Sequence, residues 1–267
     1  MPPPKPAHLE PSELGTKEYW DKLYETELAN HASNPEDTGT VWFDDSDAEA
    51  KMVQFLVNLD DEGSLHARTI LDLGCGNGSL LRAVREELFA DGVPEDEPAP
   101  RLLGVDYSEA SISLARNVNE NGEDDDNEVP ITFTVWDMLQ GSASDIIDTE
   151  GSLPADGWDL VLDKGTFDAI SLGNSSTPQE EGAAQSVEVQ YRAQVLNLLK
   201  PGGRFLITSC NWTETELCAW MEDEEERGQR GAWLIKAGRV AYPSFQFGGV
   251  QGQTVCTVCF EKKVIEA

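Results

Sequence analysis

The stretch ILDLGCGNGSLL, residues 70–81, decides the fold. A strand pattern comes first, Gly74, Gly76 and Gly78 follow within five residues, and an apolar pattern with helical spacing begins directly after them. A strand that passes through a glycine-rich turn into a helix is typical of a doubly wound α/β sheet, in which ligands bind at the carboxyl ends of the strands. The glycine loop is therefore the first candidate binding element.

Strand and helix patterns alternate after this stretch, which is typical of a mostly parallel sheet covered by helices on both faces. We therefore predict an α/β domain over residues 66–267, with an antiparallel last strand at the edge of the sheet. The predicted strands cover 69–73, 101–106, 131–137, 158–163, 203–210 and 254–264, and the main predicted helices cover 79–90, 108–120 (with Ser108 as a possible cap), 186–200 and 213–223.

Residues 16–65 are predicted to form a helical extension that packs on this domain. Apolar and aromatic residues at helical spacing predict one helix capped by Thr16 and a second capped by Ser46, in a capping box with Glu49. The Pro-rich residues 1–15 are predicted to be disordered. No signal-peptide or membrane-span pattern is found, so we expect a cytoplasmic protein that does not contact membranes.

The composition is strongly acidic, with 50 acidic and 19 basic residues and a formal net charge of −31 at pH 7. This charge disfavours direct binding to nucleic acid, because Lys and Arg supply most of the affinity for phosphate. It favours a basic protein partner, although acidic loops that only keep the protein soluble explain it equally well. Acidic tracts at 91–98, 120–128 and 221–227 fall between predicted elements and are expected to be surface insertions.

The five cysteines do not form a disulfide or zinc framework. Cys256 and Cys259 lie three residues apart on a predicted strand, so their thiols are expected to face opposite sides of the sheet. The chain has three histidines and lacks a second cysteine pair near this one. We therefore expect a protein of a reducing compartment without a metal site. A monomer is a separate expectation.

The glycine loop lacks the features of a phosphate site. Its spacing, G-x-G-x-G, differs from the G-x-G-x-x-G of dinucleotide-binding proteins and from the Walker motif, and it contains no basic residue. Asp72 precedes the first glycine by two residues, where a carboxylate would repel a pyrophosphate and attract an ammonium group. The loop, including the backbone of Cys75, is therefore expected to bind the cationic end of a ligand without phosphate.

Acidic residues end three successive predicted strands after this loop. Asp106, followed by Tyr107, is placed to accept hydrogen bonds from ribose hydroxyls, and Asp137 to accept one from an adenine amine while Met138 packs on the ring. Asp163 ends the fourth strand. Any single acid there is more often a turn residue, but the ordered series describes the parts of S-adenosylmethionine. A dehydrogenase or a non-catalytic scaffold fits the series less well.

These motifs resemble a known family. The glycine motif resembles the class I seven-stranded S-adenosylmethionine-dependent methyltransferases, and the resemblance implies a Rossmann-like sheet of seven strands. Four further stretches resemble the elongation factor 1-alpha lysine methyltransferases, which implies methyl transfer to a lysine of that basic translation factor. A methyltransferase acting on another protein or on a small molecule is the alternative. The four stretches are YWDKLYETEL (19–28), DTGTVWFDD (37–45), LDKGTFDAISL (162–172) and YRAQVLNLLKPGGRFLITSCNWTETEL (191–217).

Five residues are candidates for the acceptor side and for closing the site. Asp163 is expected to line the acceptor site and orient the lysine amine through a hydrogen bond. Lys164 is a candidate substrate-binding residue, with a solvated lysine at the strand end as the alternative. Phe167 is a candidate apolar wall or a core residue, and Trp212 a candidate for protein recognition. Trp20, on the first helix, is a candidate lid over the cofactor.

Overall fold

The structure is a computed structural model, and it describes most of the chain. The described residues are 5–90, 92–94, 99–120, 129–146, 157–173, 186–222, 231–243, 245–247 and 250–265. Most of the acidic tracts predicted as surface insertions lie outside the described residues. Within the described ranges, no helix is long and apolar enough to cross a membrane.

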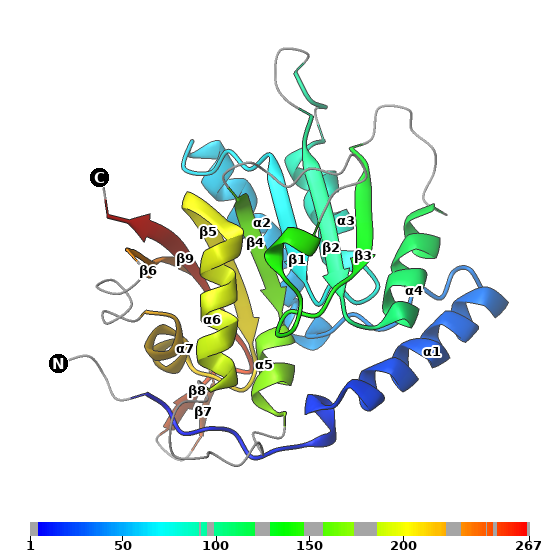
Figure 1. The fold of residues 1–267 in the computed structure, drawn as a ribbon, viewed down its shortest axis with the longest axis horizontal. Helices are drawn as coiled ribbons and strands as arrows, with labels where there is room; N and C mark the ends of the chain where they lie inside the picture. The colour runs from blue at the N-terminus through cyan, green and yellow to red at the C-terminus, as the bar shows by residue number, and fades with distance from the viewer. Residues whose placement is uncertain are drawn as a thin grey trace.

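A seven-stranded sheet forms the centre of the domain, as predicted, in the order β3-β2-β1-β4-β5-β9-β6 (Figure 1). The first five strands pair in parallel, and β9 pairs antiparallel with both β5 and β6. A separate two-stranded sheet is formed by β7 and β8. The strands are β1 (Thr69–Leu73), β2 (Arg101–Asp106), β3 (Ile131–Val135), β4 (Trp158–Lys164), β5 (Leu199–Ser209), β6 (Ala232–Val240), β7 (Phe245–Phe247), β8 (Val250–Gly252) and β9 (Cys256–Val264).

The prediction that the last strand lies at the edge of the sheet is wrong. β9 lies between β5 and β6, and the edge is β6, a strand that was not predicted. The reason is burial on both faces, since all five residues from Cys256 to Phe260 are buried. Cys256 and Cys259 belong to separate core clusters, which confirms that their thiols face opposite sides. A strand that is apolar on both faces must be covered on both faces, which a position inside the helix-covered sheet provides.

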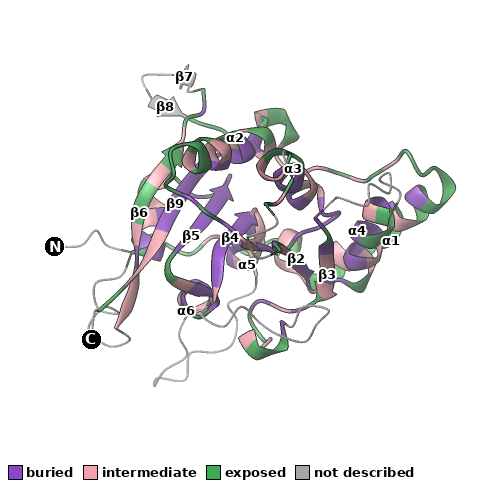
Figure 2. Cartoon of the chain, turned by 90° about the horizontal axis from the view of Figure 1, so that it is seen from above, coloured by how far each residue is buried: buried purple, intermediate pink, exposed green. Residues whose placement is uncertain are grey.

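Helices cover both faces of the sheet, as the alternation predicted (Figure 2). One core cluster joins the sheet to α2, α3 and α4, and the other joins the opposite face to α5, α6 and α7. Neighbouring residues such as Ile70 and Leu71 contribute to different clusters, because successive side chains of a strand alternate in direction. The helices are α2 (Ala48–Asp61), α3 (Ser79–Leu88), α4 (Glu109–Glu120), α5 (Thr166–Ser171), α6 (Val187–Leu198) and α7 (Glu214–Met221).

Helix α1 (Lys17–Ser33) packs against α4 at the β3 side of the domain. Its predicted cap is confirmed, since the Thr16 hydroxyl accepts a hydrogen bond from the backbone N–H of Tyr19. The predicted Ser46 cap is wrong. Ser46 ends the 3₁₀ turn η2 (Asp44–Ser46), and its hydroxyl forms a hydrogen bond with the Thr254 hydroxyl. Asp47, in a left-handed conformation, is the residue that precedes α2. The Ser108 cap is also not made, because its hydroxyl is buried without a hydrogen-bond partner among the described residues.

Residues 5–15 differ from the disordered segment predicted from the sequence. This segment runs past α7 and α5 toward α1 and ends in the 3₁₀ turn η1 (Glu13–Gly15) (Figure 1). The ring of His8 lies 2.9 Å from a carboxylate oxygen of Glu188 on α6, and the backbone N–H of Ser12 donates to the carbonyl of Leu172. Leu9 packs on the core. The segment is ordered because it finds partners on the folded domain.

Candidate active site

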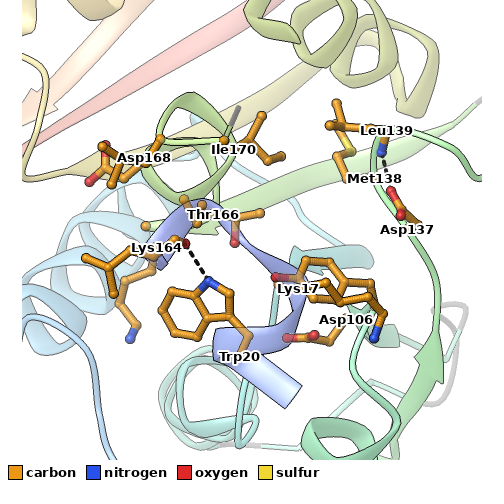
Figure 3. A pocket seen from close by; sticks show the side chains of 18 of the residues that line it. Lys17, Trp20, Asp106, Asp137, Met138, Leu139, Lys164, Thr166, Asp168 and Ile170 are labelled. Carbon is orange, nitrogen blue, oxygen red and sulfur yellow. Dashed lines mark hydrogen bonds between the residues drawn. The ribbon is translucent and has the colours of Figure 1, made fainter. Parts of the chain in front are cut away.

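A cavity of about 420 Å³ opens at the carboxyl ends of the central parallel strands, beneath α1 and the N-terminal segment (Figure 3). This is the position at which open α/β sheets bind ligands, and the volume is within the usual range for small-molecule sites. The structure brings half of the fourteen predicted site residues together here. Those lining the cavity are Trp20, Gly74, Asp106, Tyr107, Asp137, Met138 and Lys164.

The glycine loop approaches its neighbours too closely for side chains. Gly74 has a φ of +63°, and a Cβ there would lie 2.0 Å from Oγ1 of Thr166. That hydroxyl donates to the carbonyl of Leu73, which joins the end of β1 to the start of α5. At Gly76 a Cβ would lie 2.6 Å from the Tyr24 hydroxyl oxygen. The loop is thus fixed by contacts with α5 and α1 that only glycine permits.

The deeper part of the loop lies beside a second, smaller cavity. Asp72, Cys75 and Gly76 line this space, whereas Gly78 packs beneath Phe133. Burial raises the pKa of the Asp72 carboxyl well above its usual range, although the nearby Lys164 opposes the shift. Burial likewise raises the pKa of the Cys75 thiol, which makes it a poor nucleophile. In the part of the chain that is described, no group of three His, Cys, Asp or Glu side chains could hold a metal ion.

Asp106 presents a carboxylate to the cavity. Its oxygens accept hydrogen bonds from the backbone N–H groups of Gly76, at 3.3 Å, and Ser108, at 2.9 Å. These two bonds fix the carboxylate and leave lone pairs available, because a carboxylate has about four acceptor sites. Burial raises its pKa. Tyr107 lies beside it, and the ammonium group of Lys17 lies 5.0 Å from the centre of the Tyr107 ring.

Asp137 forms a turn after β3. Its Oδ1 accepts hydrogen bonds from the backbone N–H groups of Leu139, at 2.8 Å, and Gln140, at 3.1 Å (Figure 3). The turn places Met138 at the cavity wall with its side chain largely in the core. Asp137 and Met138 therefore both lie at the cavity, as predicted, and one carboxylate oxygen of Asp137 accepts hydrogen bonds from the backbone.

The structure does not place Asp163 at the cavity. Its side chain is 0% exposed and is not among the described residues that line the space. The carboxylate accepts hydrogen bonds from the backbone N–H groups of Thr166 and Phe167 at the start of α5, and from the Tyr191 hydroxyl. Burial raises its pKa to about 7. Asp163 thus caps a helix, and the prediction that it touches the acceptor amine is wrong.

Phe167 and Trp212 belong to the core. Phe167 packs between Tyr191 and Trp212, with ring centroids 4.9 Å and 6.2 Å away, and neither Phe167 nor Trp212 is among the described lining residues. Their sequence neighbours Asp168 and Asn211 line the cavity instead. The Asp168 carboxylate accepts hydrogen bonds from the Ser209 hydroxyl and the Cys210 N–H, and burial raises its pKa. A second acid within the same motif was the signal that sequence reasoning missed.

Lys164 is not a solvated lysine. Its ammonium group donates to the backbone carbonyl of Trp42 at 3.1 Å and lies 3.6 Å from a carboxylate oxygen of Glu49. The side chain is only 10% exposed. The Trp42 ring meets the Trp20 ring, with centroids 5.0 Å apart, and Trp42 and Phe43 both line the cavity. The Trp20 indole N–H donates to the Leu14 carbonyl, so Trp20 joins α1 to the N-terminal segment above the cavity.

Comparisons with known proteins agree with this architecture. A family model described as a methyltransferase domain matches residues 65–249. Among solved structures, the N-methyltransferase NodS from Bradyrhizobium japonicum WM9 in complex with S-adenosyl-L-homocysteine aligns with a TM-score of 0.50 and 16% identity. The alignment covers 91% of this chain and 97% of that chain. At this identity the likeness shows the fold alone.

Curated relatives align over nearly the whole chain. Protein-lysine N-methyltransferase EFM4 of Saccharomyces cerevisiae is 40% identical over 258 residues, which cover 96% of this chain and 98% of that protein. EEF1A lysine methyltransferase 2 of Danio rerio is 32% identical, covering 97% of this chain and 91% of that protein. The chain therefore belongs to the methyltransferase-domain family, in the group that contains EFM4 and EEF1A lysine methyltransferase 2.

Proposed function

We propose that this protein transfers methyl groups from S-adenosylmethionine to a lysine side chain of translation elongation factor 1-alpha. The observation that carries the proposal is the 40% identity to EFM4 over 96% of the chain. The aligned region is long enough to include the N-terminal extension that closes the cavity as well as the sheet. The net charge of −31 is compatible with a basic protein substrate, because opposite charges speed encounter.

The residues at the cavity fit this cofactor. The carboxylate of Asp106 has acceptor capacity for ribose hydroxyls, and Asp137 has one oxygen outside its turn for an adenine amine. Tyr107 and Met138 are available to pack on the adenine ring. The glycine loop offers backbone groups and the nearby Asp72 for an ammonium group, and it holds no basic side chain that would favour phosphate. When bound, the cofactor supplies an activated methyl group.

The acceptor lysine needs a neutral amine aligned with that methyl group, so the protein's task is to position and desolvate it. Asp168 replaces Asp163 as the carboxylate proposed to orient the amine, since it lines the cavity and Asp163 does not. The Ser209 hydroxyl and the Cys210 N–H hold this carboxylate in place. Its raised pKa makes it a better proton acceptor near neutral pH than an exposed aspartate.

The test is a methylation assay with labelled S-adenosylmethionine and purified elongation factor 1-alpha, followed by mass spectrometry of the peptides. We expect label on a lysine, with turnover lowered at least about tenfold in Asp168→Asn, because an amide cannot accept the proton. Absence of label despite measurable cofactor binding would overturn the assigned substrate and leave another protein or a small molecule as the acceptor. Full activity of Asp168→Asn would remove Asp168 from the acceptor site.

A further inference from the structure

The segment formed by Trp42 and Phe43, called here the aromatic segment, has a strained backbone at the cavity wall. Phe43 has a φ of +64°, and the only other non-glycine residue with positive φ in the described ranges is Asp47. A bulky residue in this conformation costs about 1–3 kcal/mol and persists only where its surroundings enforce it. Both residues of the segment line the cavity. The strained backbone therefore lies at the cavity, where it can contact a bound ligand.

Four contacts enforce this conformation. The Phe43 carbonyl accepts hydrogen bonds from the backbone N–H groups of Ser46 and Ala48, at 3.2 Å and 3.3 Å. The Phe43 ring lies against Gly165, where an added Cβ would be 3.2 Å from two ring carbons. On the other side of the strained residue, the Trp42 carbonyl accepts the hydrogen bond from Lys164 at 3.1 Å. Lys164 and Gly165 are neighbours at the end of β4, so one short stretch of the sheet holds both residues of the segment.

Lys164 is prepared for this contact by its charge environment. Its ammonium group lies 3.6 Å from Glu49 on α2, and Glu49 is itself fixed by a 2.7 Å hydrogen bond from the Ser79 hydroxyl on α3. Asp72 is near enough to interact electrostatically with it. These carboxyl groups stabilise a cation that is 10% exposed. The lysine is thus a fixed donor between the sheet and the aromatic segment.

We propose that Lys164 is a positioning residue that holds the aromatic segment in place, so that the Trp42 and Phe43 rings form the wall along which the acceptor lysine enters. This inference rests on the proposed function and deepens it by naming the residues that recognise the acceptor. Aromatic faces suit both the methylene stem of a lysine and its charged or methylated end. Figure 3 shows Lys164, which holds Trp42, on the side of the cavity away from Asp137 and Met138.

The experiment compares Lys164→Met with Lys200→Met as a matched control. Lys200 forms an ion pair with Asp159, which lies near the opposite end of β4. In Lys164→Met we expect the KM for the protein substrate to rise about tenfold, with a smaller change in the Kd for cofactor. Hydrogen exchange at the Ser46 and Ala48 amides should quicken about tenfold, because their acceptor carbonyl loses its support. Lys200→Met should change none of these.

Trp42→Ala, alone and combined with Lys164→Met, tests whether Lys164 acts through the aromatic rings. If it does, adding Lys164→Met to Trp42→Ala should change KM by less than about threefold, since the effects of residues acting as a unit do not add. A full tenfold rise in KM on adding Lys164→Met to Trp42→Ala would overturn the proposal. A Kd for the cofactor that rises in Lys164→Met as much as the KM for the protein substrate would also overturn it. If Lys164→Met does not fold, Trp42→Ala alone must still raise the KM for the protein substrate more than the Kd for the cofactor. Otherwise the proposal that the aromatic rings line the acceptor path is wrong.

The two proposals fail in different ways. Without methylation by the wild-type protein, the proposed function fails. Hydrogen exchange then still decides whether Lys164 holds the segment. With methylation but an unchanged KM in Lys164→Met and in Trp42→Ala, the proposed function stands and the positioning role is overturned.

Discussion

Strands β2 and β4 each carry an aspartate at the same edge of the sheet, and the two carboxylates have different partners. Asp106 accepts two backbone hydrogen bonds and faces the cavity. Asp163 accepts two backbone hydrogen bonds and a third from the Tyr191 hydroxyl, and it has no exposed surface. The two acids are one register position apart, because Leu73 of β1 pairs with Asp163 on one side and with Val105, not Asp106, on the other. The same residue type is thus a candidate ligand group in one strand and a structural cap in the other.

The register and the connection after each strand together explain the difference. After β2 the chain passes through Tyr107 and Ser108 before α4 begins. After β4, Gly165 turns the chain at once with a φ of +96°, and α5 begins at the next residue. The unpaired N–H groups of the first helical turn then point back at Asp163 and use its carboxylate. An acid at a strand end therefore stays free for a ligand only where the following helix starts later.

The largest effect expected from this comparison is on stability. Asp163→Ala should lower the free energy of unfolding by about 3 kcal/mol, because it leaves two helix N–H groups and the buried Tyr191 hydroxyl without an acceptor. Denaturant unfolding followed by circular dichroism measures the loss. A variant of wild-type stability that has lost turnover would return Asp163 to the acceptor site.

Asp163→Asn is the control for charge, because the amide keeps the shape and one acceptor. The pKa of about 7 means that the folded protein keeps this proton over a range in which the unfolded chain has lost it. The free energy of unfolding should therefore fall as pH rises from about 4 to 7. In Asp163→Asn that decline should be shallower by up to about 1.4 kcal/mol per pH unit. Equal slopes in the two proteins would contradict the raised pKa.

At the β2 end the expected effect is on binding. Asp106→Ala should weaken S-adenosylmethionine binding by about 1–3 kcal/mol, the usual contribution of hydrogen bonds to a charged group, as measured by calorimetry. The free energy of unfolding should fall less than in Asp163→Ala, because Asp106 borders the cavity, where water can replace a lost acceptor, whereas Asp163 is fully buried. Unchanged affinity would exclude the ribose role of this carboxylate.

The features predicted correctly from the sequence depend on neighbours along the chain. The strand, loop and helix of residues 69–88 follow from local periodicity, and Asp106, Tyr107, Asp137 and Met138 reach the cavity because strand ends meet at one edge of the sheet. The Thr16 cap is also a local feature. Such features need only the period of the apolar residues and the chemistry of one turn.

The features that were missed depend on distant partners. Lys164 takes its hydrogen-bond acceptor from Trp42, 122 residues earlier, and Asp163 takes a third donor from Tyr191, 28 residues later. The position of β9 inside the sheet depends on β6, a strand without a clear pattern in the sequence. The ordered N-terminal segment depends on Glu188 and Leu172 of the folded domain. No local pattern contains these pairings.

The smallest effect on stability and on cofactor binding is expected at Asp137, which combines features of the structural cap Asp163 and of the cavity-facing Asp106. One of its oxygens forms a turn, as in a structural cap, and the side chain also lines the cavity, as Asp106 does. In Asp137→Asn the amide oxygen can keep the turn, so the free energy of unfolding should change by less than about 0.5 kcal/mol. The amide NH₂ cannot accept from an adenine amine, so cofactor affinity should fall by about 1 kcal/mol.

Calorimetry on wild type and Asp137→Asn, with Asp145→Asn as a control at the nearby 3₁₀ turn η3 (Ala143–Asp145), separates the two roles. A fall in stability without a fall in affinity would mean that Asp137 serves the turn alone. The contrast between β2 and β4 would then extend to β3, leaving Asp106 as the one strand-end acid of the series that contacts the cofactor. A fall in affinity alone would instead show that a carboxylate can cap a turn with one oxygen and bind a ligand with the other.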